Sequence, residues 1–574
     1  MEKVESLAVS RKFLPEGLNV SAWEQVEAYF NDLLSRDIST PEGLHGWLID
    51  RSELEAFLSE EIGWRYIRMS CDTSNEELAK AFNFFVGEIQ PRIAPLSHRL
   101  DIQLLNSKAI GSLNSRPYEI MLRQIRKRTE IFREENVPLI AELQQREQEF
   151  SAINGAMTIE VNGKEITLQQ ATNYLEGNDR EVRKDVYQKV ATRRLSDKNK
   201  LDELLNDLIS QRHQIALNAG FASYRDYMFA ALGRFDYTPE DCMRFHASVE
   251  KRIVPLNNRL EALRRDELGL QEMKPWDILA ARGDEKPLKP FDGSDDLMKK
   301  TIACFTEIDP FLGECMQAMQ NAKRLDLESR KGKAPGGYNY PLYETGLPFI
   351  FMNSTNTLRD MVTMVHEGGH AVQSIVDMPL ELVDFKNLPS EVAELASMSM
   401  ELITMEHWHH FFADPTDLRR AKRKHLEDVL KGLPWISCVD AFQHWLYTHV
   451  GHSAAEREKA WEECYLRFGG NVVDWNGQEA YRNNLWQKQL HIFEVPFYYI
   501  EYGFAQLGAI AVWKNYRENP KTTISNYLEA LKMGYTASIG EIYQRAGVRF
   551  DFSEDYVKDL CDFVLAELDQ LVEA

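Results

Sequence analysis

The amino-acid sequence predicts a mainly helical protein with very little β-structure. Apolar residues recur at helical spacing through most of its 574 residues, as expected of amphipathic helices packed around a core. The charge-rich stretch 116–150 shows this spacing; two to four helices are expected before it, and more at 178–235 and 239–266. Segments that alternate apolar and polar residues, as strands do, are few and short.

Three segments depart from the helical pattern. At 159–168, Asn162 and Gly163 lie between alternating apolar positions, a pattern typical of a two-residue β-hairpin turn. The segment 282–295 is rich in proline, glycine and charge, and 331–346 carries four glycines beside three tyrosines. The first segment is predicted to be an exposed loop, and the second is predicted to be another loop.

A short strand and then a long helix are predicted after the second loop. The apolar run 347–353 favours a strand, and Pro348 would confine it to a sheet edge or a strand start. A helix capped by Ser354, Thr355 or Thr357 is expected next. The buried stripe of this helix comprises Leu358, Met361, Val362, Val365, Gly369, Val372 and Val376.

Composition excludes several classes of function. The formal net charge is −22 and no long run of Lys or Arg occurs, so nucleic acid and anionic membrane surfaces are not expected partners. The seven scattered cysteines form no CxxC pair, which indicates reduced thiols. The sequence shows neither the apolar core of a signal peptide nor the ~18 consecutive apolar residues of a membrane helix. We therefore expect a cytoplasmic protein.

Residues 366–370, with the sequence His-Glu-Gly-Gly-His, form an HExxH motif. On a helix, His366 and His370 project from the same face, so both imidazoles can bind one metal ion. Glu367 is offset by one residue and could take a proton from a water held by that metal. The alternative is a pair of structural histidines. The two glycines favour the metal site, because each costs about 1 kcal/mol inside a helix and indicates close approach of another group.

A catalytic zinc needs a third protein ligand, and the next predicted helix, beginning near Pro389, supplies three glutamates. Glu394 and Glu401 are seven positions apart and share a helix face. Glu391 lies in the first turn, where the helix dipole stabilises any acid, so its loss is expected to cost only about 0.3–1 kcal/mol. We assign Glu394 as the third ligand. Glu401 is assigned to orient a ligand histidine, with a solvated surface acid as the alternative.

The segment HEGGHA followed by SEVAELASMSME resembles the oligoendopeptidase F and thimet oligopeptidase family of zinc peptidases. In that family the third ligand opens an E-x-x-S-x-x-x-E pattern, which residues 394–401 match. The resemblance implies one Zn²⁺ ion and a mainly helical, two-lobed body with a deep substrate cleft and a small β-sheet beside the HExxH helix. We expect an N-terminal lobe with a hairpin at 1–190 and a catalytic domain at 191–574. Many members carry a histidine where this chain has Gln373, which leaves the subfamily open.

A second segment, HIFEVPFYYIEY, resembles the histidine-and-tyrosine segment of the same family and of angiotensin-converting enzyme. The resemblance implies that His491 and Tyr502 stabilise the tetrahedral intermediate, while Tyr498 or Tyr499 positions the substrate. Tyr498 and Tyr502 are four residues apart on one helix face, and Pro496 suits the first turn of that helix. Without the metal motif, these tyrosines would be interpreted as core packing.

The runs GKAPGGYNYP and GLPFIFMN also resemble the substrate-lining segment of the family. This resemblance implies that Gly337, Tyr338 and Phe351 contact the peptide. The predicted edge strand Phe349–Asn353 would pair with the substrate backbone, and the loop 332–343 would close over it on glycine hinges.

The sequence thus predicts a zinc endopeptidase that hydrolyses internal bonds of short, unstructured peptides, with Glu367 as general base. One alternative is a carboxypeptidase or dipeptidyl carboxypeptidase, which would need a cationic group for the free carboxylate. Another is a helical peptide-binding protein with a non-catalytic metal site. The sequence leaves the oligomeric state, the cleavage preference and the metal used in the cell open.

Overall fold

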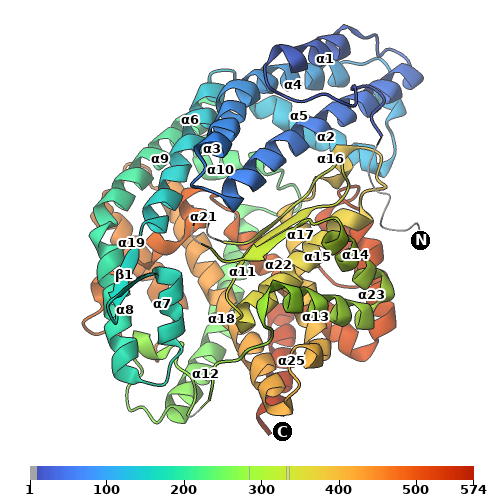
Figure 1. The fold of residues 1–574 in the computed structure, drawn as a ribbon. Coiled ribbons are helices and arrows are strands. Elements are labelled where there is room, and N and C mark those ends of the chain that lie inside the picture. Colours follow the sequence, from blue (N-terminus) through green and yellow to red (C-terminus); the bar gives the residue numbers. More distant parts are fainter. Residues whose placement is uncertain (1–9, 284, 331, 335, 574) are drawn as a thin grey trace.

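A computed structural model describes residues 10–283, 285–330, 332–334 and 336–573. In Figure 1, an N-terminal group of helices lies across one end of a larger helical body, and the strands are few and short. The predicted mainly helical, two-lobed fold with a small sheet beside the HExxH helix is confirmed. Among the described residues, no helix is both long and apolar enough to span a lipid bilayer.

The N-terminal lobe has a hydrophobic core of its own. Its elements are α1 (Glu24–Ser35), α2 (Pro41–Cys71), α3 (Glu76–Phe84), η2 (Phe85–Ile89), α4 (Gln90–Leu105), η3 (Ile110–Ser112) and α5 (Arg116–Ile131). Their core includes Trp47, Phe57 and Ile125 and is joined by Leu382 and Phe385 from much later in the chain. The lobe is therefore anchored on the body by apolar packing.

The body begins with a long helix and a hairpin and continues through a further series of helices. These elements are α6 (Asn136–Gly155), β1 (Thr158–Val161), β2 (Lys164–Thr167), α7 (Leu168–Leu175), α8 (Arg180–Ser196), α9 (Lys198–Asn218), α10 (Tyr224–Ala231), α11 (Pro239–Arg252), α12 (Val254–Glu267), η4 (Pro275–Asp277), α13 (Gly293–Ile308) and α14 (Pro310–Asn321). The predicted stretch 116–150 is thus divided between two helices, α5 and α6.

The rest of the body contains the HExxH helix and the helices around it. They are β3 (Leu325–Glu328), β4 (Tyr338–Tyr340), β5 (Phe349–Ser354), α15 (Leu358–Val376), α16 (Val383–Lys386), α17 (Ser390–Thr404), η5 (Met405–His410), α18 (Pro415–Thr448), α19 (Ala454–Phe468), α20 (Glu479–Arg482), η6 (Leu485–Lys488), α21 (Leu490–Phe493), α22 (Tyr499–Glu518), α23 (Pro520–Leu531), α24 (Ile539–Arg545) and α25 (Glu554–Glu573). Helices α15, α17 and α22 pack together and belong to the main core.

The hydrophobic cores of the lobe and of the body indicate where the chain divides into domains. Core residues of the N-terminal lobe end at Ile125 except for Leu382 and Phe385. Leu143, Phe150 and Tyr187 already belong to the core of the body. The division at residue 190 stays a prediction, and the packing favours a boundary before Leu143 instead.

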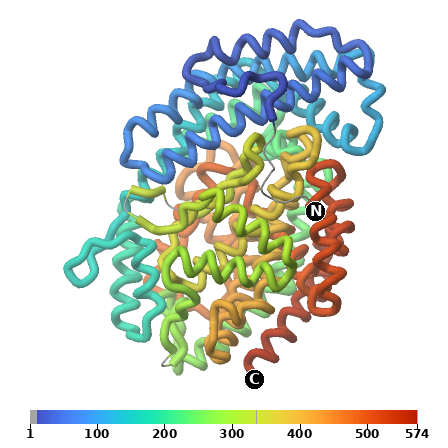
Figure 2. Tube along the Cα trace, turned by 45° about the vertical axis from the view of Figure 1, so that its right-hand side comes forward, coloured from blue at the N-terminus to red at the C-terminus, as the bar shows by residue number. Residues whose placement is uncertain are grey.

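The predicted hairpin at 159–168 is confirmed. Strands β1 and β2 pair antiparallel, with Val161 opposite Lys164, and Figure 2 shows the hairpin at the outer edge of the body. Asn162 and Gly163 both have positive φ, 53° and 73°, as a type I′ turn requires. Asn162 and Gly163 therefore form the turn because both residue types tolerate a positive φ.

The second sheet corrects the prediction for 347–353. Its strand order is β3-β5-β4, with β5 parallel to β3 and antiparallel to β4. The predicted edge strand is therefore the central one, and β4 lies at the edge. Pro348 does not distinguish a central strand from an edge strand here. It lies just before the first residue of β5, so its missing N–H removes no hydrogen bond from the sheet in either case. The sheet packs on α2 through Ile67 and on α15, between the lobe and the body.

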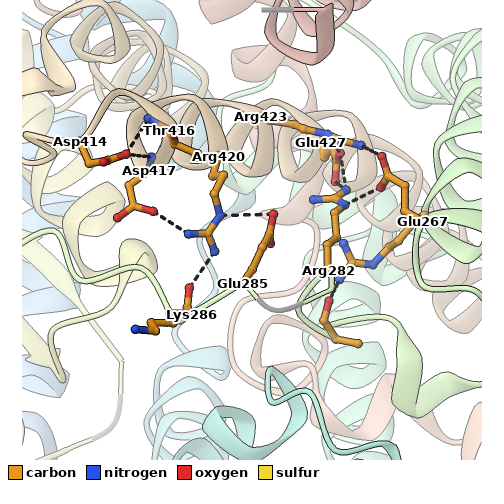
Figure 3. Close-up of polar contacts among 12 residues, drawn as sticks. Glu267, Arg282, Glu285, Lys286, Asp414, Thr416, Asp417, Arg420, Arg423 and Glu427 are labelled. Atoms are coloured by element: carbon orange, nitrogen blue, oxygen red, sulfur yellow. Dashed lines mark hydrogen bonds and ion pairs between the residues drawn. The ribbon is translucent and has the colours of Figure 1, made fainter.

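The loop at 282–295 is held down more firmly than its composition suggests. Its Arg282 forms an ion pair with Glu427 of α18 at 2.7 Å, and its Glu285 pairs with Arg420 of α18 at 3.3 Å. Figure 3 shows these pairs in two groups of linked polar side chains along α18, one around Arg420 and one around Arg282 and Glu427. Networks of this kind fix a loop better than isolated surface pairs, which contribute at most about 1 kcal/mol each.

Candidate metal centre and active site

The HExxH motif lies on α15, which begins with a well-formed cap. Of the three predicted capping residues, Thr357 takes the position: its hydroxyl accepts from the backbone N–H of Asp360, whose carboxylate accepts in return from the Thr357 N–H at 2.9 Å. This capping box satisfies two backbone donors that the helix would otherwise leave unpaired. It fixes the start of the helix about two turns before the motif.

The two glycines of the motif are needed for close packing, as the sequence indicated. A Cβ on Gly369 would lie 2.6 Å from the Cα of Ser397 and 2.8 Å from the backbone oxygen of Ala396, both on α17. A Cβ on Gly368 would lie 2.8 Å from the ring of Phe305 on α13. Helices α15 and α17 therefore touch backbone to backbone beside the motif, which brings Glu394 near the two histidines.

We expect Gly369→Ala to destabilise the fold and weaken metal retention. The added methyl group meets backbone atoms, so α17 has to move, and overpacking of this kind typically costs about 1–3 kcal/mol. Thermal unfolding and zinc content measure the two effects. Gly46→Ala, on an open face of α2 with no atom within 4 Å of the added Cβ, is the matched control and should be slightly stabilising. Equal stability of Gly369→Ala and the wild type would contradict the close approach.

His366, His370 and Glu394 converge on one point. The Glu394 Oε2 atom lies 3.4 Å from His366 Nε2 and 3.6 Å from His370 Nε2, and one donor atom from each residue falls within 4.8 Å of the others. The Glu394 side chain is 4% exposed, and the imidazoles are 18% and 17% exposed. Two imidazoles and a carboxylate at such separations are a donor set that suits zinc.

The groups around these three side chains fix their orientation. Glu401 Oε1 lies 2.7 Å from His366 Nδ1, which leaves the Nε2 atom of His366 directed to the centre. Glu394 accepts from the Tyr498 hydroxyl at 2.9 Å on one oxygen and from the Ser397 hydroxyl at 3.0 Å on the other. Partners of this type commonly orient metal ligands.

Glu391 lies away from this point, and the sequence underestimated its role. Its side chain is 2% exposed and lies beside Arg234, which also pairs with Glu501 at 2.7 Å. Removing Glu391 would leave buried charges imperfectly compensated, which costs more than a dipole interaction. We therefore expect its loss to cost more than the ~0.3–1 kcal/mol of the dipole interaction, because position in the helix does not describe the packing across it.

Glu367 sits beside the three converging side chains with an unused oxygen. Its side chain is buried, and its Oε2 has no hydrogen-bond partner within the described ranges. Burial raises the pKa of Glu367 to about 7, a value suited to exchanging protons near neutrality. Such an orphaned buried oxygen indicates that another group, a water or substrate, completes the site.

The histidine and tyrosines of the C-terminal segment gather as a cluster. The His491 ring lies 5.7 Å from the Tyr502 ring and 4.8 Å from the Tyr499 ring, and Tyr498 lies 5.2 Å from Tyr502. The Tyr498 hydroxyl reaches Glu394, which places the cluster beside the three converging side chains. The four predicted residues therefore lie together.

The start of helix α22 differs from the expectation. The helix begins at Tyr499 and not at Pro496, because Phe497 adopts a positive φ of 69° that no α-helix contains. The Phe497 N–H donates to Gln443 at 2.7 Å, and its carbonyl oxygen accepts from Arg234. These buried contacts hold the bend that turns the tyrosines toward α17.

Sequence reasoning missed two residues that fix His491. The Trp435 Nε1–H donates to Gln489 Oε1 at 3.2 Å, and the Gln489 Nε2 lies 2.7 Å from His491 Nδ1. Because an indole N–H can only donate, the amide oxygen of Gln489 must face Trp435 and its NH₂ must face His491. The Nδ1 atom of His491 is then an acceptor, so its proton sits on Nε2. No motif signals this, since Trp435 and Gln489 are 54 residues apart.

The predicted substrate-lining residues divide into two groups. Gly337 lies over Glu367, because a Cβ on it would be 3.8 Å from Glu367 Oε1. Tyr338 stacks on Phe351 with ring centroids 4.8 Å apart, and its hydroxyl is 2.5 Å from Ser70. Phe351 is 0% exposed, so its predicted contact with the peptide is wrong: as part of the central strand it supports Tyr338 from below.

Comparisons with known proteins identify relatives along almost the whole chain. Residues 173–561 match the model of "Peptidase family M3", and residues 18–132 match "Peptidase M3 N-terminal domain". The chain is 25% identical over 421 residues to "Oligopeptidase PepF" of Bacillus subtilis (strain 168) and 26% identical over 367 residues to "Oligoendopeptidase F, plasmid" of Lactococcus lactis subsp. cremoris. These matches cover 72% and 62% of this chain but only 60% and 59% of the relatives' own length.

A solved structure, described as PZ peptidase A with an inhibitor, matches with a TM-score of 0.91 and 28% identity. The match covers 97% of this chain and 99% of the other, so the two share one helical fold throughout. Because the family model spans more than half of the sequence and includes the HExxH helix, α17 and α22, the chain belongs to peptidase family M3, together with the oligoendopeptidase F proteins that it matches.

Proposed function

We propose that the chain is a zinc-dependent endopeptidase that hydrolyses internal bonds of short, unstructured peptides. The observation that carries this proposal is the convergence of His366, His370 and Glu394 with the buried, unpartnered carboxylate of Glu367 beside them. A structural histidine pair would need neither a third converging donor nor an orphaned carboxylate. A helical binding protein with a non-catalytic metal would have no use for Glu367.

One zinc ion fits the donor set of His366, His370 and Glu394. The hydrogen bond from Glu401 directs the Nε2 atom of His366 to the centre, and the fourth position is left for water or substrate. Zinc, when bound, polarises a carbonyl group and makes a coordinated water more acidic. The remaining chemistry falls to side chains of this chain.

Glu367 acts as the proton carrier. In its charged form it accepts a proton from the attacking water, and it then donates that proton to the leaving amine. The raised pKa favours proton donation to the leaving amine. At neutral pH a carboxyl group with a pKa near 7 populates both its charged and its protonated form, so it can both accept and donate the proton. Gly337 lies against the Glu367 carboxylate. Because glycine has no side chain there, a substrate chain can approach the Glu367 carboxylate closely.

Tyr502 and His491 stabilise the negative charge that develops on the scissile carbonyl oxygen. Neutral donors suit this task, because they gain strength only as the charge appears. Burial lowers the pKa of His491 to about 4, so the ring is neutral at pH 7. The bond from Gln489 leaves the remaining proton on Nε2, where it can be donated.

We expect Tyr502→Phe to reduce turnover by about 10²–10³ with a much smaller change in the Michaelis constant, because one oxyanion donor is lost. Steady-state kinetics on a short peptide measure the split. Tyr498→Phe is the matched comparison. Its hydroxyl is bound to Glu394, so its removal should mainly weaken zinc retention. If Tyr498→Phe shows the turnover loss while Tyr502→Phe behaves as the wild type, the two tyrosines have been assigned in reverse.

We expect Gln489→Glu to change the pH profile of turnover. The new carboxylate accepts from both Trp435 and His491 Nδ1, so a neutral His491 has its lone pair on Nε2 and only the protonated ring donates there. Turnover should fall as the pH rises through the raised pKa of His491, by up to about 10²–10³. Gln489→Leu, which frees the tautomer, should give a loss without that new dependence. A Gln489→Glu profile that parallels the wild type would contradict the tautomer assignment.

We assign strand β4 as the strand that pairs with the substrate backbone. It replaces the strand Phe349–Asn353, which the sequence predicted for this role. β4 lies at the edge of the sheet and runs along α15, where Asn339 contacts the Glu367 carbonyl at 3.4 Å. An extended peptide can add a strand at such an edge. A folded protein would first have to unfold locally, so peptides of roughly five to twenty residues are the proposed substrates.

The alternative activity is a carboxypeptidase or dipeptidyl carboxypeptidase on the same scaffold. The experiment that separates the two is mass spectrometry of the fragments released from a mixed peptide library. Cuts at internal bonds would support the endopeptidase. Residues released only from free C-termini would support the alternative and would overturn the proposal.

A further inference from the structure

A second group of metal-type donors lies outside the active site, where α13 meets η5. Three histidines of η5, namely His407, His409 and His410, surround the single carboxylate of Glu307 on α13. Its Oε2 lies 3.1 Å from His409 Nε2 and 2.6 Å from His410 Nε2, and its Oε1 lies 3.3 Å from His407 Nδ1. One donor atom each from Glu307, His409 and His410 falls within 4.8 Å of the other two.

The donor types match those of the active-site cluster, with two imidazoles and one carboxylate. His409 and His410 are adjacent in sequence and their ring centroids are 4.4 Å apart. Three charged imidazoles this close would repel one another, whereas neutral imidazoles present lone pairs that a divalent cation can bind. His409 and Glu307 are 51% and 44% exposed, so an ion from solution has direct access.

His407 lies beside the carboxylate, with its Nδ1 atom at ion-pair distance from Glu307 Oε1 but without a hydrogen-bond partner among the described residues. Its Nε2 atom is 2.9 Å from the Tyr516 hydroxyl of α22, which directs Nδ1 toward Glu307. Outer contacts of this kind orient ligands in known metal sites. These three donors, two imidazoles and one carboxylate, are partly exposed to water, which leaves room for a fourth ligand.

We propose that Glu307, His409 and His410 bind a second divalent cation, of the zinc, nickel or cobalt type, as a clamp between α13 and η5. The location gives the clamp a structural role. Phe305, two residues before Glu307, packs on Gly368 of the HExxH helix, and η5 continues directly from α17, which carries Glu394 and Glu401. The ion therefore joins α13, which packs on α15, to η5, which continues from α17, without touching the reacting groups.

Because the three ligands are far more exposed than those of the active site, this ion should bind more weakly than the catalytic one. Binding should raise the unfolding temperature and leave turnover unchanged. The inference does not depend on the proposed peptidase mechanism, since none of its ligands takes part in it.

Equilibrium dialysis against micromolar Zn²⁺ tests the site, with the zinc content determined by elemental analysis. The wild type should take up one equivalent more than the double variant His409→Ala, His410→Ala, and extra zinc should raise the unfolding temperature of the wild type alone. Glu307→Gln, which keeps the shape of the side chain, should lose the same equivalent. The Glu394→Ala variant should still fill this site, which separates it from the active centre.

His45→Ala is the matched control. His45 forms an exposed pair with Glu381 at 2.9 Å, but no second histidine joins it in the part of the chain that the structure describes. This variant should bind as much zinc as the wild type. Equal uptake by the wild type and the double variant would overturn the proposal, as would loss of the equivalent in His45→Ala.

Discussion

Glu367→Gln should keep one zinc ion per chain and lose nearly all turnover. Glutamine has the shape of glutamate, but it cannot accept a proton from the attacking water or return it to the leaving amine. Loss of a positioned general acid and base typically reduces the rate about 10²–10⁴-fold. Glu367 is not one of the three converging donors, so metal retention should not change.

Elemental analysis and steady-state kinetics on the same preparation measure both quantities. A Glu367→Gln protein that loses its zinc would show that Glu367 is a ligand. A variant with near-normal turnover would remove the basis for interpreting HExxH as a catalytic motif. Far-ultraviolet circular dichroism serves as the folding control, because the side chain is buried and a misfolded protein would also be inactive.

Glu394→Ala is expected to abolish zinc binding at the His366–His370 centre and, with it, all turnover. The Glu394 carboxylate faces both imidazoles at 3.4 and 3.6 Å, so its removal leaves two donors where a catalytic zinc needs three. The effect should exceed the 10–100-fold loss of affinity that follows removal of an outer partner such as Glu401. The Tyr498 hydroxyl also loses its acceptor, which adds to the disorder of the site.

Glu391→Gln is the matched control for this variant. It lies one turn earlier on the same helix and is equally buried, but it faces Arg234 and not the histidines. It should lower the unfolding temperature and still bind zinc. If Glu394→Ala retains zinc while Glu391→Gln releases it, the third ligand has been assigned to the wrong residue.

Local regularities in the sequence were enough to predict which side chains converge at the candidate site. The four-residue spacing of His366 and His370 and the seven-residue spacing of Glu394 and Glu401 are properties of a helix, and a helix is what forms at both places. The glycine pair indicated a close approach, and the backbone of α17 makes it at Gly369. The Asn162-Gly163 turn was predictable for the same reason, since its conformation depends on adjacent residues.

Contacts between distant segments could not be predicted in this way. Whether the strand at Phe349 is central or at an edge depends on β3 and β4, which its own residues do not specify. The burial of Phe351 follows from that position. Gln489 reaches His491 locally, but its amide orientation depends on Trp435 from another helix. The cost of losing Glu391 likewise depends on Arg234, far away in the sequence.

The most direct test of the central claim is a zinc titration of metal-depleted protein. The reporter is a peptide blocked by an N-terminal acetyl and a C-terminal amide group, which only an endopeptidase can cut. Cleavage should be absent without metal, rise linearly with added Zn²⁺, and reach its plateau at one equivalent per chain. Full cleavage by the metal-free protein, or no cleavage at one equivalent, would contradict the account of a single catalytic zinc held by His366, His370 and Glu394.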